Sequence, residues 1–116
     1  MALRIKRIYD APDNHDGYRV LVDRLWPRGI AKEKAALDEW LKDVAPSPEL
    51  RTWFHHEPDK FEDFTKLYNA ELKKNSAVHN LVELNRHHKT VTLLYAAKDP
   101  QINHAKVLKD FIESVT

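Results

Sequence analysis

The chain of 116 residues contains no cysteine and only two glycines, Gly17 and Gly29. Without cysteine the protein forms no disulfide, builds no thiolate zinc site and has no cysteine nucleophile. Two isolated glycines cannot form the glycine-rich phosphate cradle of a Walker or Rossmann site. Cysteine-dependent enzymes and these two classes of nucleotide-binding protein are therefore excluded.

Long apolar runs and an excess of charge of one sign are also absent. No apolar run approaches the ~20 residues that span a bilayer, so no membrane partner is expected. Met1 to Arg4 leads into a strand-like pattern without an apolar signal region, so we expect a cytoplasmic protein. Nineteen Lys and Arg oppose eighteen Asp and Glu, a net charge of +1, which argues against a dedicated nucleic-acid binder.

Apolar periodicity predicts alternating strands and helices within one domain over residues 1–116. Residues 91–97 form a continuous apolar run, which is typical of a strand buried on both faces. Residues 39–44 fit both helical spacing and strand alternation, and we expect a strand there. Ser47 and Asp99 each precede a proline, as N-cap residues do. The expected strands are residues 3–9, 18–23, 39–44 and 91–97, and the expected helices are residues 31–37, 48–56, 58–74, 77–88 and 100–115.

This order of elements predicts an α/β fold, a single compact domain with a mostly parallel sheet of about four strands flanked by helices. In open parallel sheets, ligands bind outside the carboxyl ends of the strands. Three segments follow expected strands in this way, residues 23–29, 45–51 and 98–104. We expect these segments to meet at one site.

The first segment carries Arg24 and Arg28 on either side of Trp26, with Gly29 closing the turn. A planar guanidinium suits bidentate contact with a phosphate, sulfate or carboxylate. The alternative is that Asp23 pairs internally with these arginines, which then brace the loop. Trp26 is expected in the core or in the lining of a cleft, since large aromatic side chains are mostly buried.

The second segment leads into a helix on which Arg51 and His55 lie four residues apart, a spacing that places both on one helix face. Such a pair brings a cation and a proton carrier to the edge of a cleft. The alternative is an ordinary solvated helix face. His56 is adjacent to His55 and is expected to point elsewhere.

The third segment joins a central strand to a helix N-terminus, where free amides attract anions, and it includes Lys98. His104 lies four residues before Leu108, so it is expected to point inward, as a candidate for proton transfer. The alternative is a core histidine that hydrogen-bonds to Asp99 or Asn103.

These segments favour a protein that binds an anionic small molecule bearing phosphate or carboxylate, with hydrolase or transferase activity as an extension. The alternative is a non-catalytic binding or regulatory module, in which Trp26, Trp40 and Trp53 engage a protein or single-stranded RNA. The seven histidines match no metal-ligand motif, so neither a metal nor a cofactor is expected. The ligand-binding candidates are Arg24, Trp26, Arg28, Gly29, Arg51, Lys98, Asp99 and Asn103, and the catalytic candidates are His104, His55 and Asp23.

Several motifs spread over nearly the whole chain are long and unusual in combination. They are Tyr9-Asp10, residues 20–29 (VLVDRLWPRG), 37–42 (LDEWLK), 45–47 (APS) and 49–54 (ELRTWF), Phe64 with Tyr68, Glu71-Leu72, and residues 91–99 (VTLLYAAKD) and 103–105 (NHA). Together they resemble the YeaO-like family of uncharacterised bacterial proteins. The resemblance implies a compact α/β domain and brings no established activity.

A broader related group of domains of unknown function has a similar Asp-Arg element followed by proline, matched here by Asp23, Arg24 and Pro27. That group often has Cys-His-Arg after the last core strand. The aligned positions here are Asn103-His104-Ala105, so only the histidine is kept. The resemblance therefore carries the location of a site to this chain, without the thiol.

Overall fold

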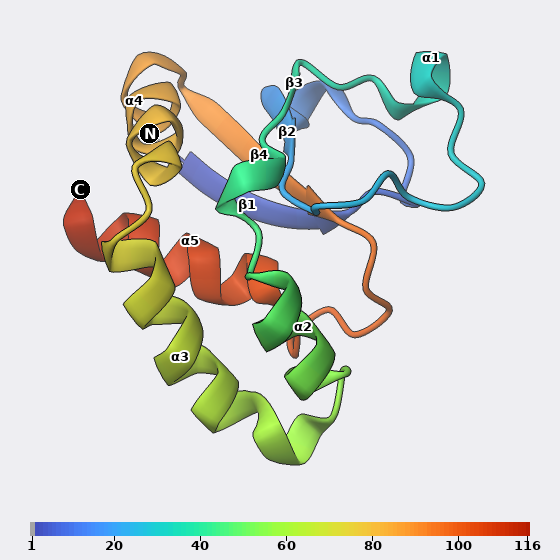
Figure 1. Ribbon diagram of the computed structural model, residues 1–116. Coiled ribbons are helices and arrows are strands. Elements are labelled where there is room, and N and C mark those ends of the chain that lie inside the picture. The colour runs from blue at the N-terminus through green and yellow to red at the C-terminus, as the bar shows by residue number, and fades with distance from the viewer. Residues whose placement is uncertain (1) are drawn as a thin grey trace.

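The fold is an α/β domain built on one sheet of four parallel strands, as the sequence predicts (Figure 1). The computed structural model describes residues 2–116; Met1, which entered the argument about a signal region, lies outside them. The strands are β1 (Ala2–Arg7), β2 (Tyr18–Leu21), β3 (Glu39–Trp40) and β4 (Thr90–Tyr95), in the order β1-β4-β2-β3. Because all pairs are parallel, every strand ends at the same edge of the sheet.

The larger helices pack against one another and against the sheet. α5 contacts β1 and β4, α3 packs on α5, and α2 packs on α3. Figure 1 shows α1 apart from the other helices, within the long connection between β2 and β3. No helix within residues 2–116 is long and apolar enough to cross a membrane. The bounds are α1 (Lys32–Ala35), α2 (Pro48–Phe54), α3 (Phe61–Lys73), α4 (Ala77–His87) and α5 (His104–Val115).

Side chains of the central strands alternate between two cores, because successive residues of a strand point to opposite faces of the sheet. Val20 and Leu93 belong to the large core beneath the helices. Leu21 and Leu94 belong to a smaller core on the other face, where partly buried Trp26 packs against them. The continuous apolar run of β4 thus serves both faces, and a loop covers the second one where many α/β folds have helices.

Several predicted boundaries are wrong. The third strand ends at Trp40 and does not reach residue 44, because after the Leu41 N–H bond to the Leu21 carbonyl the chain enters a 3-10 turn, Lys42–Val44. The first two strands end at Arg7 and Leu21, two residues before the predicted ends. The helix predicted from residue 58 begins as a separate 3-10 turn, Pro58–Lys60.

The last helix begins at His104 and not at residue 100. Its N-cap is Asn103, whose side chain accepts a hydrogen bond from the Lys106 N–H at 2.9 Å. Asp99 instead caps a short turn, accepting from the N–H groups of Gln101 and Ile102. The Asp99-Pro100 pair predicts a helix start that the structure does not have, because a second capping residue, Asn103, follows four positions later.

Helix α3 holds the start of α2 in place. The Glu71 carboxylate accepts hydrogen bonds from the Ser47 N–H at 2.9 Å and from Ser47 Oγ at 2.6 Å. Ser47 Oγ in turn accepts from the Leu50 N–H, as predicted for an N-cap. The buried Tyr68 hydroxyl donates to the Val44 carbonyl at 2.6 Å. These contacts set where α2 presents the side chains of its exposed face.

A buried ion pair fixes the long connection after β2. Arg19, 5% exposed, bonds the carboxylate of Asp16 and donates to the carbonyls of Ala35 and Ala36. Burial alone would raise the pKa of Asp16. Hydrogen bonds from Lys6, the Asp13 N–H and Arg19 outweigh it and leave the pKa below its ordinary value of 3.8.

Asp16→Asn is therefore expected to lower the free energy of unfolding at pH 7 by about 3 kcal/mol, because Arg19 loses its buried counter-ion. Because the pKa of Asp16 is lower in the folded chain than in the unfolded chain, the ionised carboxylate stabilises the fold at pH values above the unfolded pKa. This stabilisation is lost as the pH falls through the folded pKa, so the difference in free energy of unfolding between Asp16→Asn and the native chain should shrink below pH ~4. Urea titrations at several pH values measure this. Glu83→Gln, which breaks the exposed Glu83–Arg86 pair of the same i,i+3 spacing, should cost under ~0.5 kcal/mol. Equal losses from the two variants would contradict the account.

Candidate functional site

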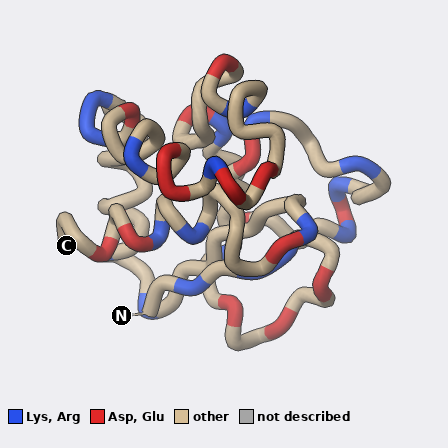
Figure 2. The backbone as a smooth tube through the Cα atoms, turned by 90° about the horizontal axis from the view of Figure 1, so that it is seen from below, with Lys and Arg blue, Asp and Glu red and all other residues tan. Residues whose placement is uncertain are grey.

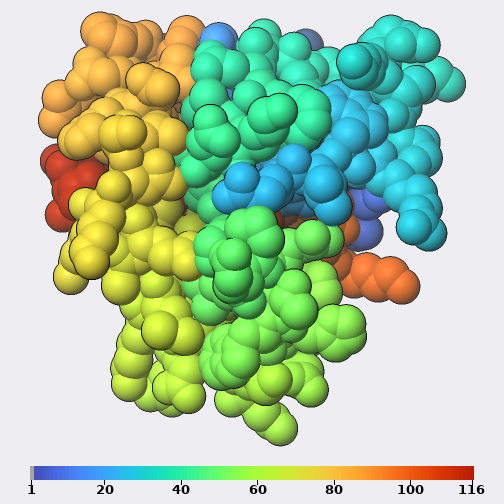
Figure 3. All heavy atoms as spheres, in the orientation of Figure 1, coloured from blue at the N-terminus to red at the C-terminus, as the bar shows by residue number. Residues whose placement is uncertain are grey.

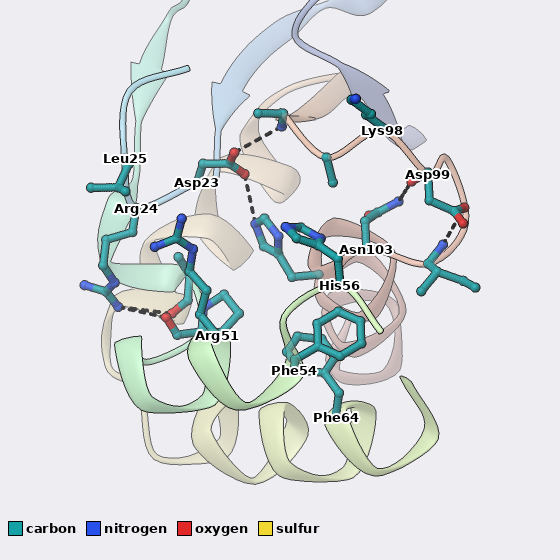
Figure 4. A pocket seen from close by; sticks show the side chains of 16 residues that line it. Asp23, Arg24, Leu25, Arg51, Phe54, His56, Phe64, Lys98, Asp99 and Asn103 are labelled. Atoms are coloured by element: carbon teal, nitrogen blue, oxygen red, sulfur yellow. Dashed lines mark hydrogen bonds and ion pairs between the residues drawn. The ribbon is translucent and has the colours of Figure 1, made fainter. Parts of the chain in front are cut away.

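A pocket of about 570 Å³ lies at the carboxyl edge of the sheet, between the ends of β2 and β4 and the start of α2 (Figure 4). Figure 3 shows a recess there, between the blue segment that follows β2 and the green α2. The three segments expected to meet at one site all contribute to it. The lining residues are Asp23, Arg24, Leu25, Ala45, Pro46, Arg51, Phe54, His56, Phe64, Ala96, Ala97, Lys98, Asp99, Ile102, Asn103 and His104.

The pocket brings together seven of the eleven residues proposed from the sequence. Four others lie outside it, for reasons given below: Trp26, Arg28, Gly29 and His55. The seven that line it are Asp23, Arg24, Arg51, Lys98, Asp99, Asn103 and His104.

Asp23 is a bridge between strand ends. One carboxylate oxygen, Oδ2, accepts the N–H of Ala96 at 3.0 Å, just beyond β4, and the other, Oδ1, lies 3.1 Å from Nε2 of His104. The alternative that Asp23 pairs with Arg24 or Arg28 is therefore wrong. The position of Asp23 directly after a buried strand explains the contact, since the adjacent parallel strand ends beside it.

His104 points inward from the first turn of α5, as expected, but its partner differs. Nε2 lies 3.1 Å from the carbonyl oxygen of Val22. Because a carbonyl only accepts, Nε2 carries the hydrogen. That hydrogen bond leaves Asp23 Oδ1 at ion-pair distance without an aligned hydrogen bond of its own. Within residues 2–116 the other ring nitrogen, Nδ1, makes no hydrogen bond.

The alternative that His104 hydrogen-bonds to Asp99 or Asn103 is wrong, because those two residues serve the loop before α5. Asn103, 1% exposed, caps α5 through Oδ1 and donates from Nδ2 to the Asp99 carbonyl at 2.8 Å. The N–H groups of Ile102 and Gln101 hold the pKa of Asp99 below its ordinary value. Asp99 therefore stays ionised, with its carboxylate turned toward the backbone of its own turn (Figure 4).

Two arginines at the pocket differ in how far they are engaged. Arg24 Nη2 donates to the carbonyls of Ala45 and Pro46, both at 3.3 Å, so it braces the loop, as the sequence alternative proposed. Its Nε is buried and has no partner within the described residues. Arg51 is exposed, and within residues 2–116 no hydrogen bond or ion pair engages its guanidinium; Figure 4 shows it rising from α2 toward the Asp23 loop.

His56, and not His55, lines the pocket. Helix α2 ends at Phe54, so the expectation that Arg51 and His55 share a helix face is wrong. His55 and His56 both adopt left-handed backbone, with φ of 47° and 56°, which costs a non-glycine residue roughly 1–2 kcal/mol. Pro58 restricts the residue before it and helps to end the helix. The adjacent histidines before this proline were the only sequence signal for the turn.

Trp26, Arg28 and Gly29 follow the chain away from the pocket. Trp26 donates from Nε1 to the Ile30 carbonyl at 2.7 Å and packs edge-on against Trp40, with ring centroids 5.4 Å apart. Trp26 was expected either in the core or in the lining of a cleft, and it packs against the smaller core. Arg28 accepts the Tyr9 hydroxyl through its carbonyl, and Gly29 turns the chain with φ of 80°. Trp53, on α2, also lies outside the pocket, and the Lys60 ammonium lies over its ring.

The lining of the pocket combines charged side chains of both signs. Three cations and two carboxylates line the pocket with two histidines, and none of the lining residues carries a hydroxyl or thiol. Within residues 2–116 no group of three or more His, Asp or Glu side chains is placed to hold a metal ion. In the view of Figure 2, Lys and Arg are interspersed with Asp and Glu along the backbone.

Comparisons with known proteins agree on one family. The family profile described as "Inactive DUF488-N3 subclade" matches residues 2–116. The chain is 45% identical to the uncharacterized protein YeaO of Escherichia coli K12, over 99% of this chain and 100% of that one. It is 42% identical to the uncharacterized protein Rv3073c of Mycobacterium tuberculosis H37Rv, over 95% of this chain and 92% of that one. No solved structure matches. The chain therefore belongs to the YeaO-like family of uncharacterised proteins, matched by the profile of the inactive DUF488-N3 subclade.

Proposed function

We propose that the protein binds a small anionic molecule, bearing a carboxylate or phosphate, in the pocket at the carboxyl edge of its sheet. The observation that carries the proposal is the guanidinium of Arg51, which faces a pocket of about 570 Å³ without an internal partner in the described residues. Arg24 and Lys98 line the same pocket. Guanidinium groups presented in this way suit carboxylates and phosphates.

The two carboxylates of the pocket offset only part of the charge of its three cations, and each of them is already engaged. Asp23 accepts from the Ala96 N–H and lies beside His104, and Asp99 accepts from two N–H groups of its own turn. A carboxylate that accepts such hydrogen bonds has much of its charge compensated locally. The cations are thus left to attract the ligand.

Binding without turnover is better supported than hydrolase or transferase activity. Where the broader group has cysteine, Asn103 is buried and uses both side-chain groups in hydrogen bonds. No hydroxyl or thiol lines the pocket to act as a nucleophile. The family profile is described as "Inactive", which supports this part of the proposal.

Arg51→Gln is expected to weaken binding of inorganic phosphate and of acetate about tenfold, because a charge-assisted hydrogen bond is lost. The fold should be unaffected, since the exposed Arg51 side chain makes no hydrogen bond in the described residues. NMR titration of the amides of residues 98–104 measures the affinity. Arg86→Gln, which removes an arginine outside the pocket, serves as the matched control. Equal affinity in the native chain and Arg51→Gln would refute the proposed site.

Incubation with 4-nitrophenyl phosphate and 4-nitrophenyl acetate should release no nitrophenol above the uncatalysed rate, because the pocket lacks an activated nucleophile. The measurement is the visible absorbance of the released nitrophenolate over hours at high protein concentration. Release that disappears in His104→Ala would instead establish a hydrolase that uses this histidine.

Glycine substitution separates the two histidines after α2. His55→Gly and His56→Gly both relieve a left-handed backbone, so each should raise the free energy of unfolding, by roughly 0.5–1 kcal/mol. The gain is smaller for His56, which also contacts the Phe54 ring. Only His56→Gly should weaken phosphate binding, about threefold, because only His56 lines the pocket. Thermal unfolding measures the change in stability, and the same NMR titration measures the affinity for phosphate. Weaker phosphate binding by His55→Gly would contradict the placement of His55 outside the pocket.

A further inference from the structure

We infer that the ligand of this pocket is an amphipathic organic monoanion, a carboxylate carrying an apolar body of about the size of a phenylpropyl group. The inference rests on the proposed function and adds the part of the ligand that charge alone does not define. It follows from three properties of the pocket, which are its apolar lining, its charge and its volume.

Half of the lining is apolar, which an inorganic anion does not need. Phe54 and Phe64 stack at the base, with ring centroids 4.3 Å apart, and Figure 4 shows both below Arg51 and His56. Leu25 is 58% exposed although most large apolar side chains of this chain are buried. Both Phe side chains are buried, so the apolar surface left open is mainly that of Leu25, Ala96, Ala97 and Ile102. Apolar surface left open in a concave site gains free energy when a ligand covers it. The apolar lining residues are Leu25, Ala45, Pro46, Phe54, Phe64, Ala96, Ala97 and Ile102.

The charge of the pocket fits a single negative charge. Arg24, Arg51 and Lys98 oppose Asp23 and Asp99, which leaves a formal charge of +1 with neutral histidines. A monocarboxylate neutralises this charge, whereas a phosphate dianion would leave an excess negative charge beside the two carboxylates. Arg51 offers a carboxylate the bidentate contact that the engaged Arg24 does not.

The volume of about 570 Å³ lies in the range of sites for small organic molecules, about 300–1,000 Å³. An acetate or phosphate ion would fill only a small part of it. With the carboxylate at Arg51, an apolar body reaches the surfaces of Leu25 and Phe54 within the same pocket.

Four probes test this ligand class by calorimetry or NMR titration: 3-phenylpropanoate, its neutral amide, acetate and inorganic phosphate. We expect 3-phenylpropanoate to bind at least about tenfold more tightly than acetate, because of the apolar area buried. We also expect it to bind at least about tenfold more tightly than 3-phenylpropanamide, because the amide lacks the charge that Arg51 recognises.

A matched pair of exposed leucines tests where the apolar body lies. Leu25→Ala is expected to weaken 3-phenylpropanoate about threefold and to leave acetate unchanged, since Leu25 lines the pocket. Leu67→Ala removes a leucine of α3 that is 49% exposed and outside the pocket, and it should change neither affinity. Both side chains are largely in solvent, so both variants should fold as the native chain does.

The outcomes separate this inference from the proposed function. If acetate and phosphate bind as tightly as 3-phenylpropanoate, the amphipathic ligand is ruled out and the anion site stands. If the amide binds as tightly as the carboxylate, the anion site itself is ruled out. Failure of all four probes would overturn both, and equal effects of Leu25→Ala and Leu67→Ala would overturn the placement of the apolar body.

Discussion

The carboxylate of Asp23 is the contact on which the pocket depends. It ties the chain just after β2 to the N–H of Ala96 just after β4, and it faces His104 at the start of α5. Two stretches far apart in the sequence, the one after β2 and the one that runs from the end of β4 to the start of α5, are thereby fixed at one edge of the sheet. The His104 hydrogen bond to the Val22 carbonyl adds a second link between the same elements. Arg24, next in the chain, then joins this edge to the start of α2 through the Ala45 and Pro46 carbonyls.

Each face of the sheet is covered by a different part of the chain. Beneath one face, α5 and α3 supply the large core, and Glu71 and Tyr68 of α3 fix the segment that leads into α2. On the other face, the connection after β2 fills the space, held by the buried Arg19. The side chains that hold these elements together are thus distinct from Arg51, which stays available on the exposed side of α2.

Much of the site could be predicted from the sequence because it follows from topology. An all-parallel sheet brings the residues after each strand to one edge, and the apolar runs ending at Asp23 and before Lys98 identify two of those positions. What failed were details settled by tertiary contacts. The pairing of Asp23 with His104 joins residues far apart in the chain, whereas the only partners that local spacing offered as an alternative were Arg24 and Arg28.

Backbone geometry limited prediction elsewhere. The left-handed conformations of His55 and His56 are unusual for residues other than glycine, so helical spacing selected the wrong histidine. Two capping residues, Asp99 and Asn103, compete for one helix start, and only the structure shows that the second begins α5. Phe54 and Phe64 were recognised as core, but periodicity does not tell which core residues also border a cavity.

A crystal structure of the protein with 3-(4-bromophenyl)propanoate tests the central claim most directly, because anomalous scattering locates the bromine independently of the refined chain. The account predicts bromine in the pocket beside Leu25 and Phe54, with the carboxylate within hydrogen-bond distance of Arg51. A pocket free of bromine at a saturating concentration of the ligand, or a carboxylate directed away from Arg51, would contradict it.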